Sequence, residues 1–259
     1  MITLYIKHNL HTIIGKRGFT LVELMIALFV SGLVMATVVS VYIAQTRSYS
    51  EQDDIANIQQ GLRGALVLLP MDIRLAGCDP TESNNPGIIA ATRTRFQFTR
   101  DIGGDSVNAN TGDGDVIDDS ENIAFGLAAA NATDTNNNGI VDNGDLDWSS
   151  TGSLSRLPGV VGLPPQQLQP QLIDSIADNI EALEFNYILD DGTTSLAPAI
   201  PNKIREVQIS LLARATNPAT GFVNTSTYTT ASGVVWNPPD DNFRRRMVVT
   251  SIQLRNMGY

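Results

Sequence analysis

The feature that most constrains this chain is an apolar run from Phe19 to Ala44, which contains 26 residues with one charge and no proline. A helix needs about 20 apolar residues to cross the hydrocarbon core of a bilayer. Lys16 and Arg17 precede the run, with no acidic residue upstream. Because such positive charges stay on the cytoplasmic side, everything after the run is expected outside. The predicted organisation is a cytoplasmic leader at 1–18, a membrane helix at 19–44 and an extracytoplasmic head at 45–259.

Two residues at the start of the run indicate more than a simple anchor. Gly18 lies at the junction of the basic leader and the apolar run, where the absence of a β-carbon suits a protease that approaches the backbone closely. Glu23 places a carboxylate inside the apolar run, which is costly in a membrane and therefore indicates a function. A secretory signal cleaved after Ala36 is the alternative, but the run exceeds the usual 7–15 apolar residues of such signals.

The sequence Lys16-Arg17-Gly18-Phe19-Thr20-Leu21-Val22-Glu23-Leu24 resembles the prepilin cleavage and N-methylation motif of type IV pilins and type II secretion pseudopilins. The resemblance implies cleavage after Gly18 by a prepilin peptidase, methylation of the new amino group of Phe19, and assembly into a filament through the helix. In an apolar filament core the Glu23 carboxylate could then pair with the N-terminal ammonium of a neighbouring subunit, since an unpaired charge there is strongly unfavourable.

Composition argues against catalysis and against nucleic-acid binding. The chain has a formal net charge of −10, and loss of the leader makes it more negative by three charges. Such an acidic chain is unsuited to nucleic acids, whose phosphates require clustered cations. Both histidines, His8 and His11, lie in the leader, which removes His-dependent catalysis and His-ligated zinc from the processed chain. One lysine, Lys203, remains, with no serine motif around it. We therefore expect a protein that is not an enzyme.

The apolar run continues into an amphipathic helix. Apolar residues recur at spacings of three and four, which places them on one helical stripe: Ile55, Ile58, Leu62, Leu66, Leu69 and Ile73. We expect the helix to extend to Ala76, with a local distortion at Pro70 and a stop at Gly77. The stripe should form the centre of the core of the head.

Alternating apolar residues then predict several strands. The positions are Phe96 and Phe98; Ile123, Phe125 and Leu127; Leu183, Phe185, Tyr187 and Leu189; Val207, Ile209 and Leu211; and Val248, Thr250, Ile252 and Leu254. The spacing of Leu172, Ile176 and Ile180 predicts a short helix before the third strand. The predicted fold class is α+β, with an antiparallel sheet packed on the long helix and long loop insertions.

Four segments sharpen the family resemblance: Met71 to Cys78, Ile180 to Phe185, Val207 to Leu211 and Ile252 to Asn256. They are similar to PilW-type minor pilins and also to J-type pseudopilins of type II secretion. The resemblance implies the type IV pilin fold and a structural subunit that primes pilus assembly or forms part of the tip. Its implied partners are other minor pilins, the major pilin and the inner-membrane assembly platform. It implies a single pass in the inner membrane with a periplasmic head, and later a place in the pilus at the cell surface.

An acidic insertion has the spacing of a calcium loop. Gly139 occupies the sixth position, where the EF-hand loop turns sharply. The candidate Ca²⁺ ligands are Asp134, Asn136, Asn138, the Ile140 carbonyl, Asp142 and Asp145. Aspartate at position 12 in place of glutamate predicts weak affinity, and a solvated Asn/Asp/Gly turn is the alternative. A pilus-borne, calcium-dependent adhesin is therefore a second functional hypothesis, beside a secretion pseudopilin.

Two further features have simpler interpretations. Cys78 is the one cysteine, so it cannot form a disulfide within the chain; it is either buried or paired with another chain, and we favour burial. The basic run Arg244 to Arg246 is interpreted as the solvated start of a strand.

Overall fold

The computed structural model describes residues 18–83, 86–103, 112–116, 121–128, 148, 151–158 and 174–258. The chain divides into two compact units, Met1–Ser50 and Glu51–Tyr259, and the long helix α1 (Leu21–Ile73) contributes to both. In the first unit, every described residue of α1 is exposed. Among the described residues, α1 is the one helix whose length and composition allow it to cross a membrane.

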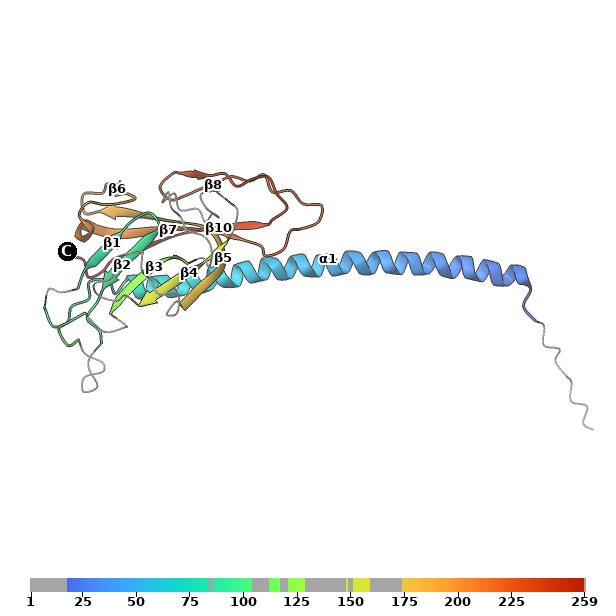
Figure 1. The fold of residues 1–259 in the computed structure, drawn as a ribbon, viewed down its shortest axis with the longest axis horizontal. Helices are drawn as coiled ribbons and strands as arrows, with labels where there is room; N and C mark the ends of the chain where they lie inside the picture. Colours follow the sequence, from blue (N-terminus) through green and yellow to red (C-terminus); the bar gives the residue numbers. More distant parts are fainter. Residues whose placement is uncertain are drawn as a thin grey trace, which may run out of the picture. The chain divides into compact units, whose positions relative to one another are not determined.

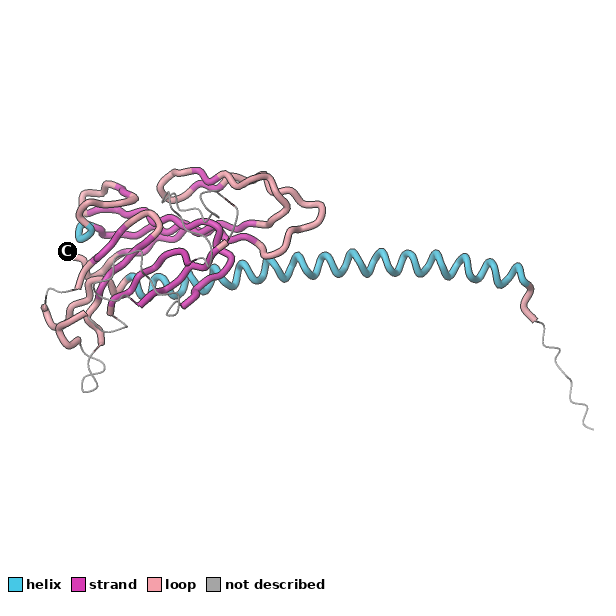
Figure 2. The backbone as a smooth tube through the Cα atoms, in the orientation of Figure 1, coloured by secondary structure: helices cyan, strands magenta, loops and turns pink. Residues whose placement is uncertain are grey.

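The second unit is built on an antiparallel sheet (Figures 1 and 2). Its strands follow the spatial order β1-β2-β3-β4-β5-β7-β10, and β6 pairs with β5. The strand bounds are β1 Ile88–Ala91, β2 Arg95–Thr99, β3 Asn122–Ala128, β4 Gly152–Pro158, β5 Asp174–Leu189, β6 Thr194–Ser195, β7 Ile204–Arg214 and β10 Arg245–Gln253. A short 3-10 helix, η2 (Pro201–Lys203), precedes β7, and a separate hairpin pairs β8 (Tyr228–Thr229) with β9 (Val235–Trp236). All five predicted strands are present, and the α+β prediction is confirmed.

The second half of α1 packs on one face of this sheet. Its buried residues are spaced by four, three, four and four: Ile58, Leu62, Ala65, Leu69 and Ile73. They form one cluster with side chains from seven of the strands, among them Phe96, Phe125, Phe185 and Ile252. The predicted stripe is correct for Ile58, Leu62, Leu69 and Ile73, whereas Ile55 is exposed. Leu66 is half-buried, and Ala65 takes the fully buried position. Burial of this stripe supplies the main apolar stabilisation of the head.

The helix ends three residues earlier than predicted. Pro70 lies in the last turn of α1, and the residues from Arg74 to Gly77 form turns. Gly77 has a φ of +72° and donates its N–H to the Thr99 carbonyl at 3.0 Å. This conformation favours glycine, and a β-carbon there would lie 2.5 Å from the Met257 sulfur, so that side chain would have to move. The predicted stop at Gly77 is thus the turn that leads the chain from the helix to the sheet.

The predicted short helix between Leu172 and Ile180 is wrong over its described part. Residues from Asp174 onward belong to β5, a strand of 16 residues. The pairing of β5 with its neighbours shifts register near Ile180, and Asn179 has a φ of +59°. Bulges of this kind move side chains between faces, so the burial of Ile176, Ala177 and Ile180 imitates a helical spacing.

Part of the opposite face of the sheet is covered by the excursion, which we define as residues 215–244 and which contains β8 and β9 (Figure 1). Trp236 packs there against Ala182 of β5 and Leu212 of β7. β5 also carries two glutamates whose side chains are fully buried, and one of them contacts the excursion. Glu184 accepts hydrogen bonds from Arg93 at 3.2 Å and from the Ser232 hydroxyl at 2.7 Å. The sheet therefore lies between α1 and the excursion.

Asp72 of α1 joins the helix to two strands. Its two carboxylate oxygens accept hydrogen bonds at 2.8 Å from Arg100, just after β2, and from Arg156 of β4. Only 6% of the Arg100 side chain and 18% of the Asp72 side chain are exposed. Ion pairs shielded in this way contribute more to stability than solvated pairs, and loss of one partner is costly. Asp72 is thus expected to fix the last turn of α1 against the sheet.

Asp72→Asn should lower the free energy of unfolding by about 2 kcal/mol, because Arg100 and Arg156 lose their shared counter-charge. Thermal unfolding of the full chain in detergent would measure the change. Asp190→Asn is the matched control, since Asp190 is 36% exposed and its pairs with Lys203 and Arg205 are long, at 3.9 and 4.0 Å. That variant should change stability by less than about 0.5 kcal/mol. Equal losses in the two variants would contradict the assignment.

Candidate functional site

The start of α1 brings the predicted processing residues into one short segment. Gly18, Phe19 and Thr20 precede the first helical turn and are exposed. Phe19 has 89% of its surface accessible. A β-carbon built on Gly18 meets no atom within 4 Å, so the fold of the described residues does not require glycine at this position. The peptide bond after Gly18 is therefore open to a protease.

Thr20 and Glu23 form a reciprocal cap on the first turn of α1. The Thr20 hydroxyl accepts the Glu23 N–H at 3.2 Å, and Glu23 Oε2 accepts both the Thr20 N–H and the Thr20 hydroxyl at 2.8 Å. This arrangement is a capping box, which satisfies backbone donors that a helix start leaves open. The motif Thr-x-x-Glu is the sequence signal that predicts such a cap. From the sequence, Glu23 was predicted to act in subunit assembly alone, and its part in the cap was not predicted.

The cap leaves part of the Glu23 carboxylate available. Both hydrogen bonds from Thr20 end on Oε2, and Oε1 has no hydrogen bond from any described residue. The surrounding side chains of α1 are apolar and exposed, including Leu21, Val22 and Leu24. A cation that entered this apolar environment would find one carboxylate oxygen already oriented by the cap. The geometry therefore suits a second, intermolecular partner for Glu23.

The predicted calcium ligands fall outside the described residues. These are Asp134, Asn136, Asn138, Ile140, Asp142 and Asp145, and Ca²⁺ binding by them stays a prediction. A different group of carboxylates is described. Oxygens of Asp101, Asp113 and Glu121 lie within 4.8 Å of one another. Asp101 accepts hydrogen bonds from the Thr81 hydroxyl and from the N–H groups of Asp113 and Gly114, so it holds two loops together.

Cys78 follows the turn at Gly77 and is half-buried. Burial raises the pKa of its thiol above the usual value, and the nearby Asp101 carboxylate raises it further. Reactive cysteines have a lowered thiol pKa, because the thiolate is the nucleophile. The environment thus favours an unreactive thiol. Complete burial, which the sequence favoured, is not observed.

The basic run at the start of β10 is less solvated than predicted. The side chain of Arg245 has no exposed surface. It donates to Glu181 at 2.6 and 3.0 Å and, at 2.6 Å, to both carboxylate oxygens of Asp241. Burial acts to lower the pKa of Arg245, but its hydrogen bonds to these two carboxylates and their negative charges outweigh burial and raise the pKa above its usual value. The prediction of a strand start is correct, whereas that of a solvated run is wrong for Arg245.

Arg244 takes part in a separate contact on the other face of β10. It pairs with Glu51 of α1 at 2.8 Å, and its guanidinium lies 4.4 Å from the centre of the Phe222 ring. Asn217 also donates a hydrogen bond to Asp54 at 3.2 Å. The excursion and the start of β10 therefore contact α1 at two polar points, one helical turn apart.

Comparison with known proteins gives two family matches. Residues 166–256 match the family described as type IV pilus-assembly protein W, PilW, and residues 14–39 match the prokaryotic N-terminal methylation motif. No curated protein has a significantly similar sequence. Among solved structures, the chain is similar to a type IV-like pilin from Thermus thermophilus, with 14% identity and a TM-score of 0.45, over 77% of this chain and 97% of that one.

Proposed function

Because this chain is a type IV pilus minor pilin of the PilW type, we propose that it helps to prime pilus assembly as part of the complex at the pilus tip. The observation that carries the proposal is the Glu23 carboxylate at the start of the exposed apolar helix, with Oε1 uncommitted among the described residues. Packed among apolar helices in a filament, this carboxylate would need a cation, and the ammonium of a processed neighbour is a suitable one. We infer that one subunit sits above this chain, so it does not occupy the extreme top.

The charge distribution supports an orientation for the unassembled protein. Lys16 and Arg17 would remain in the cytoplasm, with α1 crossing the inner membrane and the head in the periplasm. Prepilin peptidase would cleave after Gly18. The assembly platform of the inner membrane would then transfer the chain to the filament, next to other minor pilins and the major pilin. The head would finally lie at the cell surface.

The same features support a structural role without catalysis. Cleavage after Gly18 would remove both histidines, and several buried charges of the head are engaged in ion pairs, such as Glu181 with Arg245. These pairs join strands that are distant in sequence. They therefore serve the fold of the head, which matches the structural character of the matched family.

The proposal is tested by locating the protein in sheared pili and by removing it from cells. We expect mass spectrometry of pili to detect the chain at a small fraction of the abundance of the major pilin, and its deletion to reduce the number of surface pili. Restoring the full chain should restore pili. Wild-type piliation of the deletion strain together with absence of the chain from purified pili would contradict the proposal.

A further inference from the structure

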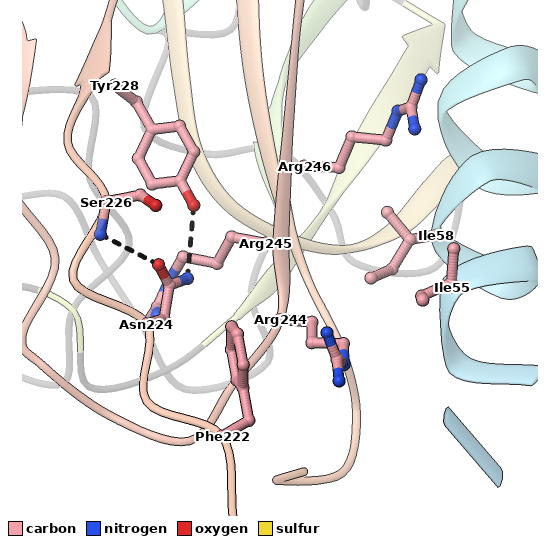
Figure 3. Close-up of a pocket in the computed structure, with 9 residues that line it drawn as sticks. All are labelled: Ile55, Ile58, Phe222, Asn224, Ser226, Tyr228, Arg244, Arg245 and Arg246. Atoms are coloured by element: carbon pink, nitrogen blue, oxygen red, sulfur yellow. Dashed lines mark hydrogen bonds between the residues drawn. The ribbon is translucent and has the colours of Figure 1, made fainter. Parts of the chain in front are cut away.

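A cavity of about 250 Å³ opens at the start of β10, next to α1 (Figure 3). Its lining comes from three parts of the second unit: the helix, the excursion and the strand. The lining residues are Ile55, Ile58, Phe222, Asn224, Ser226, Tyr228, Arg244, Arg245 and Arg246. The protein as a whole is acidic, but the lining of this cavity contains three consecutive arginines.

The three arginines differ in what they already bind. Arg245 is paired with Glu181 and Asp241, and Arg244 is paired with Glu51. The side chain of Arg246 is exposed and forms no ion pair or hydrogen bond with any described residue. In Figure 3 its side chain extends from β10 on the same side as Ile58 and Ile55. The cavity thus holds one uncompensated positive charge beside two apolar side chains.

The backbone of β10 is also open at this place. In the described part of the chain β10 pairs with β7 alone, and it is the last strand of the sheet. Arg244 and Leu254 bond toward β7 and its flanking residues, and backbone groups alternate in direction along an antiparallel strand. The N–H and C=O groups of Arg245, Met247 and Val249 therefore point away from β7. An extended peptide could pair with them.

We propose that this cavity and the adjoining edge of β10 bind one extended segment of another pilus subunit, with its single carboxylate on the Arg246 guanidinium. The proposal rests on the proposed function, which places other subunits beside this chain. One free guanidinium balances one carboxylate, whereas a phosphate group brings nearly two negative charges. The apolar surface of Ile55 and Ile58 suits the aliphatic part of a glutamate side chain and an apolar neighbour.

The overall negative charge of the chain limits the kind of partner further. With a formal net charge of −10, the chain repels polyanions such as nucleic acids and anionic membranes at long range. A short segment with one negative charge meets little of this repulsion. The single free guanidinium and the apolar lining of the cavity thus favour a peptide with one carboxylate and apolar neighbours over nucleic acids, phosphates and anionic membranes.

The test uses the full chain in detergent and a synthetic pentapeptide, Thr-Val-Glu-Val-Thr, blocked at both ends. We expect Arg246→Gln to weaken binding of this peptide about tenfold, the effect of losing a partly exposed, charge-assisted hydrogen bond. The same peptide with glutamine in place of glutamate should bind wild type about tenfold more weakly, and Arg246→Gln should not weaken it further. Isothermal titration calorimetry gives both affinities and their coupling.

Arg255→Gln is the matched control, because Arg255 is exposed beyond the other end of β10 and lies outside the cavity. It should leave peptide affinity unchanged. The proposal is overturned if Arg246→Gln binds the glutamate peptide as wild type does, or if both variants weaken it equally. Preferential Arg246-dependent binding of inorganic phosphate, or of vesicles containing phosphatidylglycerol, would also overturn it by identifying a different anion.

Failure of this proposal can be distinguished from failure of the proposed function. If the chain is present in pili but Arg246 does not affect peptide binding, only the cavity is wrongly assigned. If the peptide depends on Arg246 but the chain is absent from pili, the binding site stands and the pilus role fails. The two measurements use different material and do not depend on each other.

Discussion

Replacing Gly18 with glutamate is expected to abolish processing, so that the chain keeps its leader and is absent from pili. The wild-type chain should begin at N-methylated Phe19. The fold of this chain would tolerate a side chain at position 18, because a β-carbon on Gly18 meets no atom within 4 Å. The requirement for glycine is therefore expected to come from the protease. A side chain next to the bond to be cleaved would prevent close approach of the enzyme to the backbone. Mass spectrometry of the purified protein distinguishes the two forms.

Gly32→Ala provides the control for this experiment. Gly32 lies within α1, and a β-carbon there also meets no atom within 4 Å. Alanine at this position should be processed normally, since the change is distant from the cleavage site. A Gly18→Glu chain that still begins at Phe19 would refute the assignment of the cleavage site. A wild-type chain that begins after Ala36 would refute prepilin processing altogether.

The helix and the central strands could be predicted because their signals are local. The spacing of Ile58, Leu62, Leu69 and Ile73 reports burial along a single helix, and alternation in β7 and β10 reports burial on one face of a sheet. Such patterns need no knowledge of the partner element. The same reasoning failed in the first half of β5, where bulges break the alternation.

The buried charges could not be predicted, because their partners are distant in sequence. Glu181 looks like an ordinary polar position in a strand, yet it is fully buried between Arg214 and Arg245. Asp72 lies on the polar side of the helical pattern, but it meets Arg100 and Arg156. Each pairing depends on strand order and register, which a single sequence does not specify. The charge of Arg246 stands out only in the structure, because the side chains of its two neighbours are paired with carboxylates.

The candidate site was predictable in position but not in mechanism. Gly18, Phe19 and Glu23 were assigned from a local motif, and they lie together at the exposed start of α1. The capping box shows that Glu23 also stabilises its own helix through Thr20. The observed cap and the proposed intermolecular pairing predict different responses to different substitutions. A variant that separates the roles is therefore more informative than removal of the side chain.

Glu23→Gln is expected to separate the cap from the charge, and to reduce incorporation into pili severely. Glutamine retains a side-chain oxygen that can accept the Thr20 N–H, as in other capping boxes. It carries no charge, so the ammonium of a neighbouring subunit would lose its partner in an apolar environment, which is strongly unfavourable. We expect at least a tenfold decrease in the amount of this chain in sheared pili, measured by quantitative mass spectrometry.

Glu23→Ala and Thr20→Ala complete the comparison. Glu23→Ala removes cap and charge, so its incorporation should be as low as that of Glu23→Gln, while the core of the head, which begins at Ile58, stays folded. Thr20→Ala removes the hydroxyl partner and keeps the charge, and it should cost about 1 kcal/mol of helix stability with near-normal incorporation. If Glu23→Gln enters pili as wild type does while Glu23→Ala does not, the carboxylate acts as a cap alone, and the intermolecular pairing is wrong.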